Sequence, residues 1–386
     1  MGREKRTGRW KGRQRPGIKS LTMGLALLLL LTACGAPQPA RPEEGAGKGA
    51  SGQEGAMPTS ITVAANGGVV ERAIRDHIGA EFTKKTGIQI DFIAGLSSEI
   101  VARIEASPGN PTIDLAFIEP LDVLRLKEKG LIEPLDDASL PNRSALKADY
   151  QVEAIQDVWV PTFGYIVAPA YNTKAFEKNG WAPIASWNDL ARREFKGRTA
   201  YVDVPNTWAL LALYFLALAN GGDFDRLDPG LEKAKEMARI SETFYKNSTQ
   251  VMPVMQQGLA DVTYLSTYVI AALADQGVPI KMAAPKEGVP LQAIGPVVPK
   301  GTPKGKAARQ FIDFFLEKTS QAALTELGFS SVVEGVGVAD KYKDVLALPE
   351  GTKAFIPSPE KLMELRGTWS DRWAQEVRPE LGKGLK

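Results

Sequence analysis

Short β-rich runs alternate with amphipathic helical stretches through the first part of the folded chain, between residues 61 and 136. The alternation predicts strands at 61–65, 88–94 and 113–118, and helices at 69–85, 98–106 and 121–129. Strands that are separated by helices pair in parallel, because each connection must return to the same end of the sheet. This region is therefore predicted to be a βαβαβ unit on a parallel sheet.

The same alternation returns after Tyr171. It predicts strands at 199–203, 261–265 and 280–283, and helices at 187–194, 207–220, 231–245, 251–258 and 269–276. Two apolar extended runs, 159–171 and 292–299, are interrupted by glycine and proline and are predicted to cross between two lobes as hinge segments. The expected α/β lobes comprise residues 60–165 plus about 290–335, and residues 166–289 plus about 336–386.

The start of the chain is predicted to be an export signal rather than part of the fold. Its first 20 residues carry eight basic side chains against one acidic side chain. An apolar run at 21–31 follows, shorter than the roughly 20 residues that a transmembrane helix needs. The run ends in LTACG at 31–35, which resembles the bacterial lipobox. We expect a signal peptide at 1–33 and lipid on Cys34; a buried or reactive free thiol is the alternative.

Cys34 is the only cysteine, so the folded part must be stabilised by its core rather than by intramolecular disulfides. Removing residues 1–34 takes away eight of 47 basic and one of 45 acidic residues, which leaves 39 against 44, a net charge near −5. Such a body gives no electrostatic reason to expect nucleic acid as a partner. Residues 34–59 are poor in large apolar side chains and are expected to be a flexible, lipid-anchored linker at the outer face of the cell membrane.

Several short motifs occur in a fixed order along the folded part. They are EFTKKTGI at 81–88, IDLAF at 113–117, YNT at 171–173, SWNDL at 186–190, FKGR at 195–198, PKEG at 285–288 and an Ala-rich helix with FIDF at 307–316. Their order resembles the family 1 extracellular solute-binding proteins, the capture subunits of bacterial ABC importers. The resemblance implies a type II periplasmic-binding-protein fold, in which two α/β lobes enclose a ligand cleft. It also implies a monomer that delivers a small solute to an ABC permease and its ATPase.

Most of these motif residues are expected to build the scaffold rather than to bind a ligand. Gly87 is predicted to end a helix in the left-handed conformation. Ser186 is placed as a helix N-cap with Asp189 three residues later, as in a capping box. Trp187 is then expected to pack in the core.

In open parallel sheets, ligands bind outside the carboxyl ends of the strands, where helix N-termini offer unpaired N–H groups. The residues that this rule selects in the first lobe are Asn66, Gly67, Gly68, Ser97, Ser98 and Glu119. The two glycines allow close approach of a ligand or simply form a tight turn. One of the serines is expected to cap its helix and the other to be free for ligand. Glu119 receives a cationic ligand or favours the N-terminus of the helix that Pro120 begins.

The same rule applied to the second lobe selects Asp203, Trp208 and Tyr268, with Glu287 beside the second crossing. Asn206 is a natural N-cap for the apolar helix that carries Trp208. Trp208 could stack on a ligand or belong to the core. Glu287 could equally be a solvated turn residue.

Carboxylates and aromatic rings are the groups with which polyamine receptors of this family bracket ammonium groups. A polyamine-like cargo or another small organic ion is therefore expected, although strand 291–295 lacks the acid and the aromatic residue of the polyamine pattern. Thiamine and phosphonates stay open. The ferric branch uses two adjacent tyrosines, whereas Tyr264 and Tyr268 are four residues apart, and His77 is the only histidine. No metal site and no cofactor are expected.

The sequence does not favour an enzyme. It has no Gly-x-Ser-x-Gly motif, no cysteine in the folded part and a single histidine, which removes the usual nucleophile and base pairs. Catalysis by carboxylates alone is one alternative. The other is a solute-sensing lipoprotein with the same fold that signals to a membrane partner.

Overall fold

The computed structural model describes residues 57–385. The predicted signal peptide at 1–33, Cys34 and nearly all of the predicted linker lie outside the described residues. Within residues 57–385, no helix combines the length and the apolar character that crossing a membrane requires.

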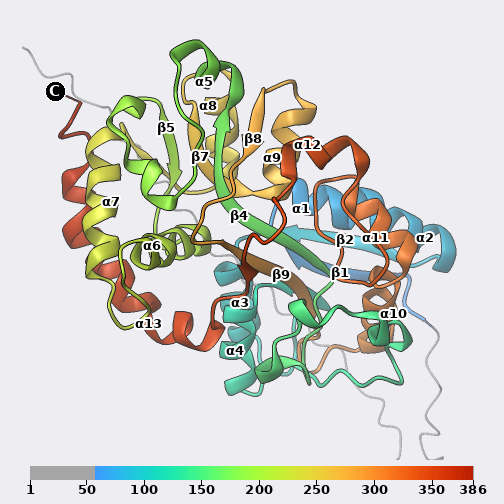
Figure 1. The fold of residues 1–386 in the computed structure, drawn as a ribbon. Helices are drawn as coiled ribbons and strands as arrows, with labels where there is room; N and C mark the ends of the chain where they lie inside the picture. Colours follow the sequence, from blue (N-terminus) through green and yellow to red (C-terminus); the bar gives the residue numbers. More distant parts are fainter. Residues whose placement is uncertain (1–56, 386) are drawn as a thin grey trace, which may run out of the picture. The chain divides into compact units, whose positions relative to one another are not determined.

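The first lobe is built on the predicted βαβαβ unit, which is confirmed (Figure 1). Its strands are β1 (Ser60–Ala65), β2 (Gln89–Ala94) and β3 (Leu115–Ile118), and β1 lies between the other two and parallel to both. The helices between and after them are α1 (Val69–Glu71), the π-helix η1 (Arg72–Gly79), α2 (Ala80–Thr86), α3 (Ser97–Glu105) and α4 (Pro120–Glu128). The predicted helix at 69–85 thus forms as one continuous helical segment, and Gly87 ends it in the left-handed conformation, as predicted.

The second lobe has a mixed sheet. Its strands are β4 (Phe163–Asn172), β5 (Thr199–Val202), β6 (Phe244–Tyr245), β7 (Val262–Ser266) and β8 (Ile280–Met282). Its helices are α5 (Thr173–Asn179), α6 (Thr207–Ala219), α7 (Asp228–Ile240), α8 (Ser248–Gln256) and α9 (Thr267–Asp275). β5 pairs in parallel with β6 and β7, and β4 runs antiparallel to β7 and β8. The carboxyl ends of β5 and β7 therefore point the same way, which places the loops after them at one edge of the sheet.

Strands β4 and β9 (Val289–Val297) join the two sheets, at the positions predicted for the crossings. They pair antiparallel from Phe163 opposite Ile294 to Ile166 opposite Leu291. β4 then continues beside β7 and β8, and β9 continues beside β3, as the long green and brown strands of Figure 1 show. The result is one connected sheet in the order β2-β1-β3-β9-β4-β7-β5-β6. The lobe boundaries stated above stay a prediction.

Glycines in the two crossing strands are needed because aromatic rings pack directly on their backbone. A Cβ atom on Gly164 would lie 2.2 Å from the Tyr150 ring. On Gly295 it would lie 2.0 Å from the Val160 carbonyl oxygen and 2.5 Å from the Trp159 ring. All three distances are far inside van der Waals contact, so the rings pack directly against the backbone of the crossing strands.

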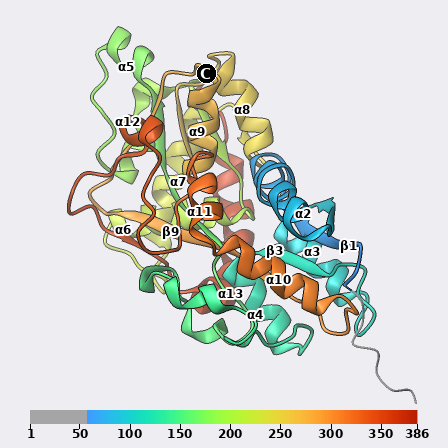
Figure 2. The ribbon, with the colours of Figure 1, turned by 90° about the vertical axis from the view of Figure 1, so that its right-hand side faces the viewer.

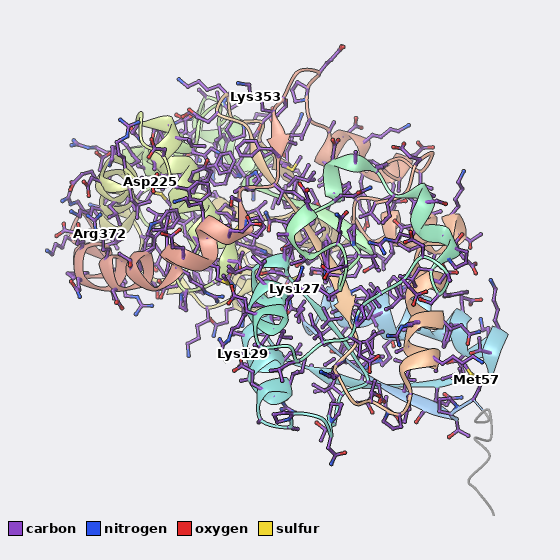
Figure 3. All side chains as sticks on the ribbon, turned by 90° about the horizontal axis from the view of Figure 1, so that it is seen from below. Met57, Lys127, Lys129, Asp225, Lys353 and Arg372 are labelled. Atoms are coloured by element: carbon purple, nitrogen blue, oxygen red, sulfur yellow. The ribbon has the colours of Figure 1, made fainter. Side chains whose placement is uncertain are left out.

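The part of the chain after β9 returns to both lobes. It contains α10 (Gly305–Phe315), α11 (Lys318–Thr325), α12 (Lys343–Leu346), β10 (Ala354–Phe355), α13 (Pro359–Arg372) and the π-helix η8 (Trp373–Val377). α10 packs beside α2 (Figure 2), where the Phe311 and Phe82 ring centroids are 4.7 Å apart. α13 contacts α4 of the first lobe and α6 of the second. Seen from below, α13 with Arg372 and α4 with Lys127 and Lys129 occupy the same face (Figure 3).

Short 3-10 turns fill the remaining connections. They are Pro141–Ala145, Ala148–Tyr150, Glu153–Ile155, Trp187–Ala191, Arg193–Phe195, Asp340–Tyr342 and Arg378–Glu380. The predicted helix at 187–194 is therefore wrong. Trp187 and Leu190 are both fully buried, and residues three apart lie on one face in the 3-10 conformation. The capping prediction is confirmed, since the Asp189 carboxylate accepts the Ser186 N–H at 3.0 Å.

A second correction concerns the predicted helix at 231–245. The helix α7 ends at Ile240, and the Ser241 hydroxyl donates to the Met237 carbonyl at 2.7 Å. Residues 244–245 form β6 on the edge of β5 instead. Two consecutive aromatic residues favour a half-buried strand over a helix end, so pairing with the sheet overrides the helical periodicity.

Candidate functional site

The loops at the carboxyl ends of the strands in both lobes surround a cavity of about 860 Å³. The first lobe contributes the loops after β1, β2 and β3, and the second contributes the loop after β5, the start of α8 and part of α9. Arg366 of α13 and Arg378 also line it. Small-molecule sites in proteins have volumes of roughly 300–1,000 Å³. The cavity is therefore large enough for an organic solute.

The structure brings nearly all of the sequence-predicted site residues to this cavity. Those that line it are Asn66, Gly67, Gly68, Ser97, Ser98, Glu119, Asp203, Trp208 and Tyr268. Glu287 lies elsewhere. Its carboxylate accepts the Ser186 hydroxyl at 2.7 Å and the Trp187 N–H at 3.2 Å. It therefore stabilises the start of the 3-10 turn at Trp187–Ala191. That these residues contact a ligand stays a prediction.

Glu119 ties the first lobe to the crossing strand and to the second lobe. Its buried carboxylate accepts the Tyr165 hydroxyl of β4 at 2.8 Å and the Thr207 hydroxyl of α6 at 2.7 Å. Burial, and then the nearby Glu119, raise the pKa of Tyr165 well above its usual value, so its hydroxyl keeps the proton that it donates. Pro120 begins α4 as predicted, but the Glu119 side chain makes no capping hydrogen bond.

Asp203 is held by two residues from the end of the chain. Its carboxylate accepts the Trp373 indole N–H at 2.7 Å and pairs with Arg378 at 2.7 Å. Asn206 caps α6 as predicted, since its side chain accepts the Trp208 N–H at 2.9 Å. The prediction of Asp203 as a ligand residue used only its place after β5, which reveals none of these partners.

Asp122 and Arg366 form an ion pair at 3.5 Å that sequence reasoning missed. Asp122 lies in the first turn of α4 and only 5% of it is exposed. Burial, reinforced by repulsion from Glu119, raises the pKa of Asp122 to about 6, while Arg366 opposes the rise. Arg366 also donates to the Pro205 carbonyl at 3.4 Å, so it touches residues from both sides of the cavity.

The polar groups near the starts of the first-lobe helices differ from the prediction in one respect. Leu96, not a serine, occupies the N-cap of α3, and its N–H donates to the Glu99 carboxylate at 3.0 Å. The Ser97 hydroxyl accepts the Glu119 N–H at 3.3 Å instead. The Asn66 Oδ1 atom is buried and has no hydrogen-bond partner within the described part of the chain. Asn66 therefore offers a site for a donor group of a ligand.

Aromatic side chains form one wall of the cavity. The Tyr165 ring lies 5.4 Å from the Tyr268 ring and 6.3 Å from the Trp208 ring, measured between centroids. Trp208 and Tyr268 both line the cavity, yet only 7% and 5% of these residues are exposed. Each therefore belongs to the core and also lines the cavity, and stacking of a ligand on Trp208 stays a prediction.

The charged lining residues that prediction missed are Arg72, Glu99, Asp122, Lys246, Arg366 and Arg378. Arg366 and Arg378 come from the end of the chain, far in sequence from the predicted site residues. Ser358 and Pro359 mark the start of α13, because the Ser358 hydroxyl accepts the Lys361 N–H at 3.2 Å. These two residues could have predicted the helix, but not its place beside the cavity. Among residues 57–385, no three acidic, cysteine or histidine side chains are grouped as metal ligands.

Comparisons with known proteins agree with the fold. The sequence profile of the bacterial extracellular solute-binding proteins matches residues 77–350. The iron uptake protein A1 of Synechocystis sp. is 23% identical over 273 residues, 67% of this chain and 72% of that protein. The spermidine/putrescine-binding periplasmic protein of Escherichia coli is 23% identical over 241 residues, 61% and 68% of the two chains. The crystal structure of an ABC transporter substrate-binding protein from Bradyrhizobium japonicum superposes with a TM-score of 0.68 at 23% identity, covering 83% of this chain and 100% of that chain.

Proposed function

Since the chain belongs to the bacterial extracellular solute-binding protein family and has the type II periplasmic-binding-protein fold, we propose that it captures a small solute for an ABC importer. The observation that supports this most directly is the cavity of about 860 Å³, lined by residues of both lobes. Its partners are then an ABC permease and its ATPase, to which the loaded protein delivers the solute.

The proposed mechanism is closure of the two lobes about strands β4 and β9. A solute that contacts both walls of the cavity stabilises the closed state relative to the open one. The hydrogen bond from Thr207 to Glu119 and the ion pair between Arg366 and Asp122 join the walls in the structure. Both interactions would break on opening, so they favour closure alongside the solute.

The cargo that this proposal includes is a polyamine-like solute or another small organic ion. One relative is named for spermidine and putrescine and another for iron uptake, so the family name alone leaves the cargo undetermined. Trp208 and Tyr268 line the cavity, and their aromatic rings offer apolar contact to the body of an organic solute.

The proposal predicts that a cognate solute both stabilises and compacts the protein. A solute at one hundred times its dissociation constant should raise the free energy of unfolding by about 2.7 kcal/mol. A thermal-shift screen would identify such solutes, and small-angle scattering should then show a smaller radius of gyration on saturation. If a solute raised the melting temperature and left the dimensions unchanged, closure would be the wrong mechanism.

We also propose that lipid on Cys34 anchors the protein to the outer face of the membrane. The lipobox-like sequence at 31–35 supports this, together with the preceding apolar run. Cys34→Ser should move the protein from the membrane pellet to the soluble fraction, with solute affinity unchanged. Equal membrane retention of the variant would contradict the lipid anchor.

A further inference from the structure

The carboxylates that line the cavity already form ion pairs or hydrogen bonds with other groups of the protein. Asp122 and Asp203 pair with arginines, and Glu119 accepts two hydroxyl donors. Glu99 accepts the Leu96 N–H and is the one exposed carboxylate among the acidic residues that line the cavity. A polycation needs several free carboxylates, and these residues do not supply them.

Two cations in the cavity wall are, in contrast, without an acidic partner in the part of the chain that the structure describes. They are Arg72, in the first lobe, and Lys246, in the second, and both are exposed. Glu71, the acidic residue next to Arg72, pairs with Arg75. A guanidinium group offers five N–H donors and an ammonium group three, all available to a solute.

The two cations line the cavity from opposite lobes, each beside a place where the lobes nearly touch. A Cβ atom on Gly68 would lie 3.8 Å from Cγ2 of Thr249, in the first turn of α8. Arg72 follows Gly68 by one helical turn, and its backbone N–H bonds the Gly68 carbonyl at 3.1 Å. Lys246 directly precedes Asn247, the N-cap of α8. The free first-turn N–H groups of this nine-residue helix add partial positive charge at the same place.

Asn66 offers a hydrogen-bond acceptor to a solute, whereas Arg72 and Lys246 offer donors. Its buried Oδ1 atom lacks a donor within residues 57–385. Asn66 directly precedes Gly67 and Gly68, the two glycines before α1. A bound solute that carries an O–H or N–H group can supply the missing donor.

We propose that the cargo is a small organic anion whose phosphate, phosphonate or carboxylate group binds between Arg72 and Lys246. An O–H or N–H group of the same solute donates to Asn66, and its organic body lies against Trp208 and Tyr268. Charge-assisted hydrogen bonds from both lobes to one anionic group would also stabilise the closed state. The inference rests on the proposed solute-binding function and specifies its substrate class.

The test uses the purified full-length protein and two sets of probes. The anionic set contains glycerol phosphate, aminoethylphosphonate and succinate, and the cationic set contains putrescine and spermidine. At least one anion should raise the melting temperature, and its affinity should fall as ionic strength rises. Arg72→Gln and Lys246→Gln should each weaken that affinity about tenfold or more.

Arg193→Gln and Lys196→Gln are matched controls, because both residues are exposed and lie outside the cavity lining, and they should leave the affinity unchanged. Stabilisation by the polyamines alone would overturn the anionic cargo but leave the solute-binding function intact. Stabilisation by an anion that both cavity variants bind as tightly as the unmodified protein would overturn the assigned residues. No stabilisation by either set would count against the anionic cargo and the proposed function together.

Discussion

Replacing Glu119 by alanine should lower the free energy of unfolding by about 2 to 4 kcal/mol. The carboxylate is buried and accepts hydroxyl donors from Tyr165 and Thr207 at 2.8 and 2.7 Å. Hydrogen bonds to a charged group contribute roughly 1.5–3 kcal/mol each, and a buried donor that loses its acceptor retains its desolvation cost. Urea denaturation followed by tryptophan fluorescence would measure the loss.

Glu128→Ala is the matched control, since Glu128 lies at the exposed end of the same helix α4 and should change stability by less than about 0.5 kcal/mol. A double-mutant cycle with Tyr165→Phe isolates the hydrogen bond itself. The coupling energy between Glu119 and Tyr165 should be about 1 to 2 kcal/mol. A coupling near zero would mean that Glu119 stabilises the protein by another route.

The sequence predicted the strand-and-helix order because that order follows from local periodicity. The runs at 61–65 and 113–118 are short and mostly apolar, and they form β1 and β3 with the parallel pairing expected. The site residues followed from the same information. Asn66, Ser97 and Glu119 come after strands whose carboxyl ends meet at one edge, so a topological rule was sufficient to bring them to one cavity.

The partners of those residues could not be predicted in this way. Arg378 follows Asp203 by 175 positions in the sequence, and Arg366 reaches Asp122 only because α13 returns across both lobes. Nothing in the local pattern of 359–378 specifies the surface against which this helix packs. The pairing of the charged residues that line the cavity therefore depends on long-range packing. The position of the cavity, in contrast, follows from the local order of strands and helices.

The glycines of the two crossing segments correctly marked where the crossings lie, but the sequence did not reveal why glycine is needed there. Gly164 and Gly295 marked the crossings as interruptions of an extended run. In the structure both lie within continuous strands, β4 and β9, and their missing side chains make room for Tyr150 and Trp159. A sequence pattern cannot distinguish a glycine that bends the chain from one that accommodates a ring.

The second large effect concerns Asp122 and the dependence of stability on pH. The pKa of this carboxyl is about 6 in the folded chain, because burial, and then repulsion from Glu119, disfavour its charged form. Its ordinary value is near 3.8, so the folded chain binds the proton more tightly than the unfolded chain. The stabilisation is fully present below about pH 3.8 and is lost as the pH rises through about 6.

Asp122→Asn should remove that contribution, because the amide does not titrate. The free energy of unfolding of the variant, relative to the unmodified protein, should therefore rise by up to about 3 kcal/mol between pH 4 and pH 7. The change with pH is the informative quantity, because the folded-state pKa of Asp122 already includes the attraction to Arg366. Any other effect of the substitution shifts the stability of the variant equally at every pH. Asp371→Asn, an exposed aspartate whose side chain has no ion-pair partner within residues 57–385, should track the unmodified protein at every pH. Parallel curves for Asp122→Asn and the unmodified protein would show that burial does not control this carboxyl, and that Arg366 holds it charged within the cavity wall.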